Sequence, residues 1–420
     1  MTITNAIETM AARARKAAGR IATLPTDVKN GVLLDLAGRI ESDRRQILEA
    51  NRRDLQAAEQ AGLGGAKLKR LTLSESGVDQ MAAGLRQIAE LPDPVGQITK
   101  HYRVPSGLEV RKVRSALGVI MMIYEARPNV TIDAFALCFK AGNASILKGG
   151  REASNSNKQL ADCAHAALGA HGIPGEGLNL LTTSDREAVK ALLRLDDYID
   201  LVIPRGGAEL IRFVHEHSRI PTVQHFHGVC HIFVDETAAV DKAIEICVNG
   251  KTSAPATCNA AECLLVHEKI AAAFLPPLAE RLITEGVEIR GDRAVSALCA
   301  SAKPASDEDW GREFLDLIIA IRVVPDLDSA VAHIHQYGSD HTDAILTRDT
   351  SHAESFTRRV QSSCTLVNAS PRFNDGFQLG LGAEIGISTS RIHAYGPMGL
   401  EELTTQRYVV TGDWQSRGPG

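Results

Sequence analysis

Long apolar runs and blocks of one charge are both missing from this sequence of 420 residues. The longest apolar stretch, 116–124, includes a glycine and falls far short of the roughly 18 residues that a membrane-spanning helix needs. Lysine and arginine total 46 against 51 aspartate and glutamate, a formal net charge of −5, and no basic cluster stands out. We therefore expect neither a membrane segment nor a nucleic-acid partner.

Paired cysteines are missing as well. The chain has eight cysteines, but no two form a Cys-x-x-Cys pair and none lies beside histidines at the spacing of metal ligands. This pattern excludes a disulfide scaffold and predicts no metal site. Residues 1–20 lack the small-residue cleavage site after an apolar core that marks a signal peptide. We expect a cytoplasmic protein whose thiols are mostly buried and inert.

The chain does contain enough apolar material for two or three folded domains, with 44% hydrophobic and 23% charged residues. Residues 1–95 show helical spacing, whereas 98–116 alternate polar and apolar residues, which predicts exposed strands that form an arm. From residue 118, short apolar runs alternate with helix-length segments, and a second such series begins near residue 235. This alternation is typical of βαβ units on parallel sheets. The later segment TTQRYVVTGDW predicts a strand that pairs with the arm.

The segment KTSAPATCNAAECLLVH, residues 251–267, sets one cysteine apart. Cys258 lies among small and polar residues and a helical pattern follows it, so we predict that its thiol lies at a helix amino terminus. There the free backbone N–H groups and the helix dipole favour a thiolate. Taken alone, any one of the eight cysteines is far more often a buried structural thiol. Cys263, in an apolar strand-like run, fits that simpler interpretation.

Three further segments place polar residues or glycines where predicted strands end. In GVIMMIYEARPNV a buried strand ends in a loop, and Asn129 is placed to cap the next helix. The strand ASILK ends at Lys148, and DLVIPRGG runs through Gly206 and Gly207 into a helix. Loops at the carboxyl ends of parallel strands commonly bind ligands. Each feature alone is weak, because a helix cap, a solvated lysine and a turn explain them equally well.

The joint order of these segments is specific. YEARPNVTIDA, LKGG, DLVIPRGG, the Cys258 loop, REF and TLVNASPRF follow one another within a resemblance that covers residues 5–410. In this order they resemble the aldehyde dehydrogenase superfamily and, within it, the γ-glutamyl phosphate reductases. The resemblance implies an α/β fold with two Rossmann-type domains on parallel sheets and a small β oligomerisation arm. It implies an NADP-binding domain of residues 1–97 and 117–232, a catalytic domain of 233–402, and an arm of 98–116 and 403–420.

The resemblance also implies roles for individual residues. Cys258 is expected to be the nucleophile, and Asn129 to hold the developing oxyanion with the Cys258 backbone N–H. Gly149, Gly150 and Arg151 replace the acidic position that binds the ribose hydroxyls in many NAD enzymes, and Arg151 suits a 2′-phosphate, so NADP(H) is the expected cofactor. The other candidates are Lys148, Gly149, Gly150, Gly206, Gly207 and Glu313 for the cofactor and, more weakly, Arg127, Ser370, Arg372 and Arg391 for the substrate.

One departure from the superfamily bears on the reaction. Hydrolytic aldehyde dehydrogenases carry a glutamate in a Glu-Leu-Gly-Gly segment that activates water, but the matching stretch here is TVQHFHGVCHIFVD. If Gly228 aligns with the second glycine, His225 takes the glutamate position, and no carboxylate lies between Arg219 and Asp235. This absence favours NADPH-dependent reduction of L-glutamyl 5-phosphate to L-glutamate 5-semialdehyde through a Cys258 thioester, in L-proline biosynthesis.

Other functions stay open. Another phosphorylating or CoA-acylating aldehyde dehydrogenase would share Cys258 and the cofactor loops. The non-enzymatic alternative is an inactive protein that keeps the fold for binding. A cysteine hydrolase is disfavoured, because spacing alone pairs no histidine with Cys258 and the cofactor loops would have no purpose. The resemblance further implies a homo-oligomer, dimer or tetramer, and a functional association with glutamate 5-kinase.

Overall fold

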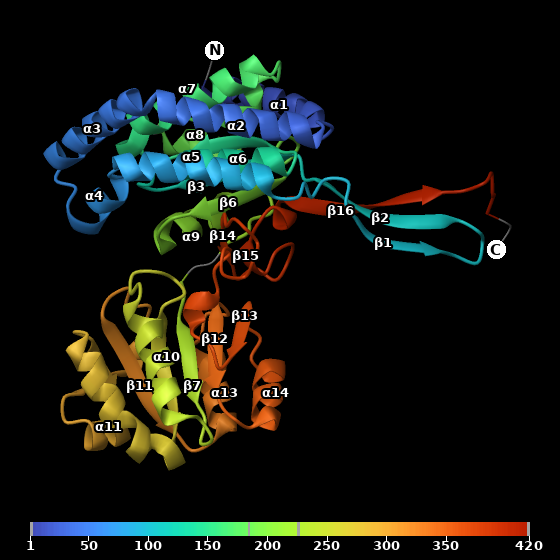
Figure 1. Cartoon of the computed structure of the whole chain (residues 1–420). Helices are drawn as coiled ribbons and strands as arrows, with labels where there is room; N and C mark the ends of the chain where they lie inside the picture. The colour runs from blue at the N-terminus through green and yellow to red at the C-terminus, as the bar shows by residue number, and fades with distance from the viewer. Residues whose placement is uncertain (1–2, 184, 225–226, 418–420) are drawn as a thin grey trace. The chain divides into compact units, whose positions relative to one another are not determined.

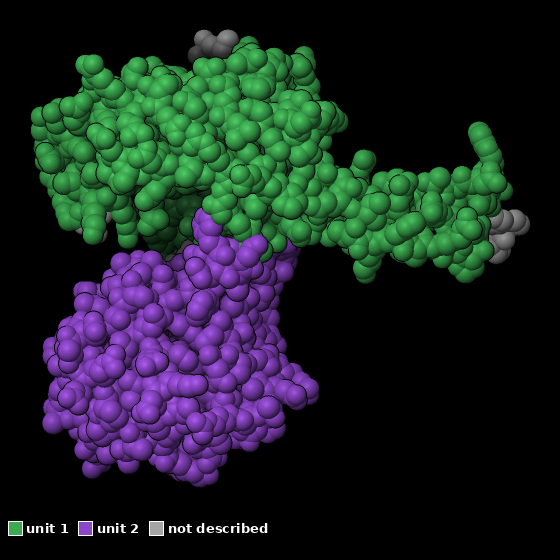
Figure 2. All heavy atoms as spheres, viewed as in Figure 1, with its two compact units in different colours: residues 1–224, 381–386, 398–420 green, residues 225–380, 387–397 purple. Residues whose placement is uncertain are grey.

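The computed structural model describes residues 3–183, 185–224 and 227–417, and the chain divides into two compact units (Figures 1 and 2). Unit 1 comprises residues 1–224, 381–386 and 398–420, and unit 2 comprises 225–380 and 387–397. Each unit contains a parallel sheet with helices, which confirms the predicted α/β class. Within the described ranges, no helix is long and apolar enough to cross a membrane.

Unit 1 is built on a four-stranded parallel sheet in the order β5-β4-β3-β6. The central β3 is buried at every position, as expected of a parallel strand covered on both faces. The strands are β3 (Val119–Tyr124), β4 (Ala144–Lys148), β5 (Leu178–Leu180) and β6 (Leu201–Arg205). The helices are α1 (Ile3–Ile21), α2 (Thr26–Ser42), α3 (Arg44–Gln60), α4 (Gly65–Leu71), α5 (Glu75–Glu90), α6 (Val130–Lys140), α7 (Ser154–Ala170), α8 (Arg186–Leu192) and α9 (Ala208–His217). The helical prediction for residues 1–95 is confirmed.

A three-stranded antiparallel ribbon extends from the rest of unit 1 (Figure 1). It consists of β1 (Ile98–Arg103), β2 (Glu109–Ala116) and β16 (Thr404–Thr411), with β2 in the centre. All six residues of β1 are exposed. Both the predicted arm and its pairing with the late strand are confirmed, because alternation of polar and apolar residues is typical of strands exposed to water.

Unit 2 contains a seven-stranded parallel sheet in the order β10-β9-β11-β8-β7-β12-β13. Successive side chains enter different apolar clusters: Ile232 and Leu264 lie in one, Phe233 and Leu265 in the other. The strands are β7 (Cys230–Val234), β8 (Ala261–His267), β9 (Glu288–Gly291), β10 (Lys303–Pro304), β11 (Ile318–Val324), β12 (Thr342–Leu346) and β13 (Cys364–Val367). The helices are α10 (Val240–Thr252), α11 (Glu268–Thr284), α12 (Arg293–Leu298), α13 (Leu327–Tyr337) and α14 (Thr350–Arg359), and β14 (Gly386–Ser388) pairs with β15 (Gly396–Met398).

The structure moves the predicted boundary between the two α/β regions. The sequence predicts a second series from about residue 235 and a domain boundary between residues 232 and 233, which divides the run HIFVD of residues 231–235. Instead β7 pairs with β8 and β12 inside the sheet of unit 2. An apolar run shows that a strand is buried but not which sheet it joins, so the sequence could not decide this. Residues 381–386 and 398–402, predicted as catalytic domain, likewise belong to unit 1.

Candidate active site

The residues of unit 1 that were predicted to belong to the site lie at the ends of three neighbouring strands, β4, β3 and β6. Lys148 is the last residue of β4 and precedes Gly149 to Arg151, Asn129 lies in the loop after β3, and Gly206 and Gly207 follow β6. Because the strands are parallel, these loops meet at one edge of the sheet. That edge, at the carboxyl ends of the strands, is where open α/β sheets commonly bind ligands.

A small recess joins the residues predicted from LKGG. Lys148 Nζ donates a hydrogen bond of 2.6 Å to the carbonyl oxygen of Gly149. Burial lowers the pKa of Lys148, and the charge of Glu152 opposes that shift. Gly149 has no room for a side chain, because a Cβ there would lie 2.1 Å from Asn157 Nδ2. The recess is lined by Lys148, Gly149, Gly150, Arg151, Ser154, Asn157 and residues 180–182.

At the start of α9, a carboxylate occupies the glycine turn. The backbone N–H of Gly207 donates to Glu125 Oε2 at 3.1 Å, and a Cβ on Gly206 would lie 2.8 Å from the same carboxyl group. The glycine turn is therefore closely approached, but its partner in this structure is Glu125, which no sequence pattern indicated. A phosphate at this helix start requires Glu125 to move away.

Asn129 occupies the position before α6, but its side chain does not cap that helix. The predicted cap is wrong, because the Asn129 backbone is already helical and its amide Nδ2 donates instead to Asp133 Oδ2 at 3.0 Å. Burial raises the pKa of Asp133 to about 6, and the hydrogen bond from Asn129 opposes this rise. The carboxyl group of Asp133 therefore sets the orientation of the Asn129 amide.

Cys258 lies in unit 2, in the loop of residues 253–260 between α10 and β8. The predicted helix start is wrong, because β8 begins three residues later and the first helix begins only at Glu268. The run AECLLVH fits a buried strand because it lies between β7 and β11, where every residue of β8 is buried. Cys258 therefore does not lie at the amino terminus of a helix.

The other cysteines were expected to be buried. Six of them are, at positions 138, 163, 230, 247, 263 and 299, but Cys364 is half-buried like Cys258. Burial raises the pKa of Cys138 and of Cys163 to about 12, so these thiols stay protonated at neutral pH. Exposure thus separates Cys258 from six of the seven other cysteines, and its loop of small residues separates it from Cys364.

The segment that precedes β7 packs against the backbone of Cys258. A Cβ on Gly228 would lie 2.0 Å from the carbonyl oxygen of Cys258, so only glycine fits there. The Cys230 thiol donates to the same carbonyl at 3.2 Å. The Gly228 backbone N–H donates to Glu313 Oε1 at 2.9 Å, while burial raises the pKa of Glu313. Glu313, predicted to contact the cofactor, is thereby connected to the Cys258 loop.

These residues gather at the amino ends of the strands in unit 2. Gly228 precedes β7, Cys258 precedes β8 and Glu313 precedes β11, three strands that are adjacent in the sheet. The candidate residues of unit 1 lie instead at the carboxyl ends of their strands. The candidate residues thus lie at the carboxyl ends of the strands in unit 1 and at the amino ends in unit 2. No local sequence pattern indicated this difference.

One of the weak substrate candidates, Arg372, lies against the Cys258 loop, and Ser370 supports it. Arg372 Nε donates to Ser253 Oγ at 3.1 Å, and its Nη1 donates to Thr257 Oγ1 at 2.8 Å. Ser370 is buried, and its hydroxyl accepts from the backbone N–H of Arg372 at 3.4 Å. The structure thus gives Ser370 a structural role as the cap of a short turn, and places Arg372 beside the Cys258 loop.

The remaining candidates are less informative. Arg391 donates to Asp340 Oδ2 at 3.1 Å and to Gln361 Oε1 at 2.7 Å, so its charge is already paired. Arg127 is exposed in the loop after β3 of unit 1. His225, which replaces the hydrolytic glutamate in our alignment, lies outside the described residues.

One buried cluster was not anticipated. Ligand atoms of His231, Cys263 and His333 lie within 4.8 Å of one another. Although burial opposes protonation, Asp343, whose Oδ1 lies 3.0 Å from His231 Nδ1, and the nearby Cys263 raise the pKa of His231 to about 10. Arg322, which can only donate, lies 3.2 Å from His333 Nδ1, so the proton of neutral His333 is on Nε2, which faces Cys263. A protonated nitrogen cannot bind a metal, and the cluster is therefore a hydrogen-bonded network of the core.

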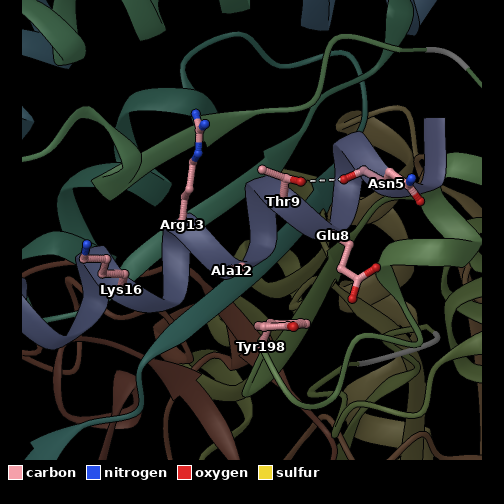
Figure 3. A pocket seen from close by; sticks show the side chains of 7 residues that line it. All are labelled: Asn5, Glu8, Thr9, Ala12, Arg13, Lys16 and Tyr198. Carbon is pink, nitrogen blue, oxygen red and sulfur yellow. Dashed lines mark hydrogen bonds between the residues drawn. The ribbon is translucent and has the colours of Figure 1, made fainter. Parts of the chain in front are cut away.

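A second hollow lies along α1, and its lining contains none of the predicted site residues (Figure 3). Figure 3 shows Tyr198 on one side of α1, whereas the side chain of Arg13 points to the opposite side. The side chains around this hollow do not converge on a common point, so we assign it no ligand. It is lined by Asn5, Glu8, Thr9, Ala12, Arg13, Lys16 and Tyr198.

Comparisons with known proteins agree with this arrangement. The profile of the "Aldehyde dehydrogenase family" matches residues 3–303. A γ-glutamyl phosphate reductase of Xanthomonas campestris is 53% identical over 98% of this chain and 99% of its own, and one of Desulforapulum autotrophicum is 52% identical over 99% and 100%. The crystal structure of γ-glutamyl phosphate reductase from Thermotoga maritima has a TM-score of 0.96 at 42% identity and covers 98% of this chain and 100% of its own. An acetylating aldehyde dehydrogenase from Geobacillus thermoglucosidasius shares only the fold, with 16% identity, a TM-score of 0.70 and coverage of 99% and 98%.

Proposed function

This chain belongs to the aldehyde dehydrogenase family, and we propose that it works as a γ-glutamyl phosphate reductase. The enzyme reduces L-glutamyl 5-phosphate to L-glutamate 5-semialdehyde and phosphate, a step of L-proline biosynthesis. Identity of 53% over 98% of the chain supports the kind of substrate. The observation that carries the chemistry is the geometry of Cys258. Its thiol is partly exposed, and Gly228 packs directly against its backbone carbonyl.

The proposed reaction begins at the Cys258 sulfur. Its thiolate forms a bond to the C5 carbonyl carbon of the substrate, and the C–O bond to phosphate breaks with the electron pair on the leaving phosphate. We assign to the Asn129 amide the role of donor to the developing oxyanion, which its hydrogen bond to Asp133 supports by fixing its orientation. A thioester on Cys258 results.

A reduced nicotinamide cofactor, when bound, supplies the hydride that the thioester carbon accepts. The residues present fit such a group, because the recess lined by Gly149 and Gly150 offers the Lys148 ammonium and Arg151. The resulting thiohemiacetal collapses when its C–S bond breaks, which returns Cys258 and releases the semialdehyde. Glu313, fixed by the N–H of Gly228, is proposed to hold the ribose next to the nicotinamide.

Exchange with phosphate separates this reaction from its alternatives. We expect NADP⁺ reduction by glutamate 5-semialdehyde to require phosphate, because the sequence between Arg219 and Asp235 offers no carboxylate to activate water. The measurement follows absorbance of the reduced cofactor with phosphate, or with sulfate at equal ionic strength as control. Equal turnover in both would indicate a hydrolytic dehydrogenase, and turnover that requires coenzyme A would indicate an acylating one.

NADP(H) is the form of the nicotinamide cofactor that we propose. Arg151 is exposed at the recess, while Glu152 Oε1 accepts from the backbone N–H of Ala126 at 2.8 Å and is already engaged. An arginine suits a 2′-phosphate, whereas a free carboxylate would suit ribose hydroxyls.

Replacing that arginine tests the preference. Arg151→Ala is expected to raise KM for NADPH about tenfold and to leave KM for NADH nearly unchanged, because a hydrogen bond to a charged group contributes about 1.5–3 kcal/mol. The exposed Arg45→Ala in α3 is the control, and initial rates with both cofactors are the measurement. Equal changes for NADPH and NADH would contradict the assignment.

We further propose that the arm joins copies of the chain into a dimer or tetramer. β1 exposes all of its residues, and Tyr408 and Val410 of β16 are 64% and 51% exposed. Exposed edge strands with apolar side chains readily pair with another strand. Tyr408→Lys combined with Val410→Lys is expected to give a smaller particle by light scattering, and an unchanged mass would contradict the proposal.

A cytoplasmic location and a functional association with glutamate 5-kinase complete the proposal. A reducing compartment suits a chain whose eight cysteines, all within the described ranges, form no disulfide, including the one that must act as a thiolate. The substrate is an acyl phosphate of the glutamate side chain, so a kinase that phosphorylates this carboxylate must supply it.

A further inference from the structure

A buried ion pair closes the base of the Cys258 loop. Lys251 Nζ lies 2.6 Å from Glu262 Oε2, and both side chains are completely buried. Lys251 belongs to the last turn of α10, and Glu262 is the second residue of β8. Since residues 253–260 connect these two elements, the pair fixes the distance between the two ends of the loop that carries Cys258.

The same carboxylate also holds the segment that leads to β11. Glu262 Oε1 accepts from the backbone N–H of Leu315 at 3.3 Å. Leu315 has φ +54, a left-handed conformation that is uncommon for a residue other than glycine. Its side chain is 41% exposed, so burial of the leucine does not explain the conformation. The hydrogen bond to Glu262 is therefore a contact that favours this backbone geometry.

Leu315 lies two residues from Glu313, which accepts from the Gly228 N–H at 2.9 Å. Gly228 in turn lies directly against the carbonyl of Cys258. The contacts form a closed ring that runs from the ion pair through Leu315, Glu313 and Gly228 back to the nucleophile loop. All members belong to unit 2.

Stability does not account for the pair. A buried ion pair loses the hydration of both charges, and apolar residues of similar volume often replace it without loss of stability. Direct participation in the reaction is excluded as well, because neither side chain reaches solvent. The pair instead has a geometric effect, since Glu262 binds both Lys251, which precedes the loop, and Leu315, in the segment that leads to β11.

We propose that Lys251 and Glu262 are positioning residues that keep Glu313 at a fixed position relative to Cys258. The proposal rests on the proposed function, in which Glu313 holds the cofactor ribose while the Cys258 thioester accepts hydride. Loss of the pair leaves the cofactor bound in a less defined position relative to the nucleophile. Replacing the pair must therefore change KM for the cofactor and kcat. The change in KM must depend on the presence of the Glu313 carboxylate.

The test uses the full-length double variant K251M/E262M, in which two apolar side chains fill the space. We expect a thermal midpoint near that of the wild type, a kcat about tenfold lower and a KM for NADPH about tenfold higher, since misplacement by about 1 Å can cost about 100-fold in rate. KM for the amino-acid substrate should not change. In the background of Glu313→Gln, the same double replacement should have little further effect on KM for NADPH.

Asp235→Asn serves as the control. Asp235 is also a buried, paired carboxylate of unit 2, but it follows β7 at the opposite edge of the sheet. This variant should lose stability and keep both KM values. If K251M/E262M behaves like the control, or if its effect adds fully to that of Glu313→Gln, the positioning role is wrong.

Direct binding separates this proposal from the proposed function. The Kd for NADPH, measured by cofactor fluorescence, needs no turnover. If the wild type lacks phosphate-dependent activity yet K251M/E262M weakens NADPH binding through Glu313, the proposed reaction fails while the positioning role stands. If turnover is phosphate-dependent and the Kd is unchanged in the variant, the positioning role fails alone.

Discussion

Replacing Cys258 with alanine is expected to abolish formation of glutamate 5-semialdehyde, with kcat lower by about three orders of magnitude or more. No thioester can form without this sulfur, and direct hydride transfer to an acyl phosphate has no covalent intermediate to divide the barrier. Steady-state rates give the loss. Mass spectrometry of the wild type mixed with substrate and no cofactor should show a glutamyl adduct on the peptide that contains Cys258.

Cys364→Ala is the matched control, because Cys364 is the other half-buried cysteine. It should keep wild-type turnover and should still form the adduct at Cys258. Substantial turnover in Cys258→Ala, or an adduct located on Cys364, would overturn the assignment of the nucleophile. Full activity in the control and none in the variant would support it.

Gly228→Ala is expected to be nearly as damaging, although it only adds a methyl group. The new Cβ would lie 2.0 Å from the carbonyl oxygen of Cys258 and 3.0 Å from its Cα. These are backbone atoms, so the segment before β7 and the Cys258 loop must move apart. We expect kcat/KM to fall about 100-fold, together with a loss of about 1–3 kcal/mol in unfolding free energy from overpacking.

Gly84→Ala in α5 provides the control, because a Cβ there meets nothing within 4 Å. It should leave kcat/KM unchanged and slightly raise stability through better helix propensity. Rates and thermal unfolding of both variants give the comparison. If Gly228→Ala keeps kcat/KM within about threefold of the wild type, the close packing behind Cys258 does not control the reaction.

Much of the fold could be predicted from periodicity. The alternation in 98–116 and the run VIMMIY each predict the exposure of the strand that forms, because exposed and buried strands differ in side-chain pattern. For the residues after Cys258 the same reasoning gave two answers: the strand-like run that contains Cys263 is confirmed, whereas the helical pattern directly after Cys258 is wrong. AECLLVH contains no β-branched residue before Val266, so the run is compatible with a helix, and only its place between two strands decides.

Candidate residues could be predicted from the sequence where the residue type and its neighbours in the chain indicate the chemistry. Contacts between residues far apart in the chain could not be predicted. Cys258 stands out by its loop alone. The contacts of Glu125 with Gly207 and of Glu262 with Lys251 depend on how the chain returns to the same place. A charged residue inside an apolar run was the one available signal, since a buried Glu262 needs a partner.

The ribbon of β1, β2 and β16 also constrains when the protein can be completed during synthesis. β2 is made early, but its partner β16 emerges about 290 residues later, as the contact of Ala116 with Thr404 illustrates. Unit 1 also depends on this late segment, because Asn143 Nδ2 donates to the carbonyl of Leu403 at 2.9 Å. A nascent chain therefore displays the β1–β2 hairpin without its third strand until β16 has left the ribosome. The assembly that we propose for the ribbon is in this way reserved for chains that have been translated to the end of β16.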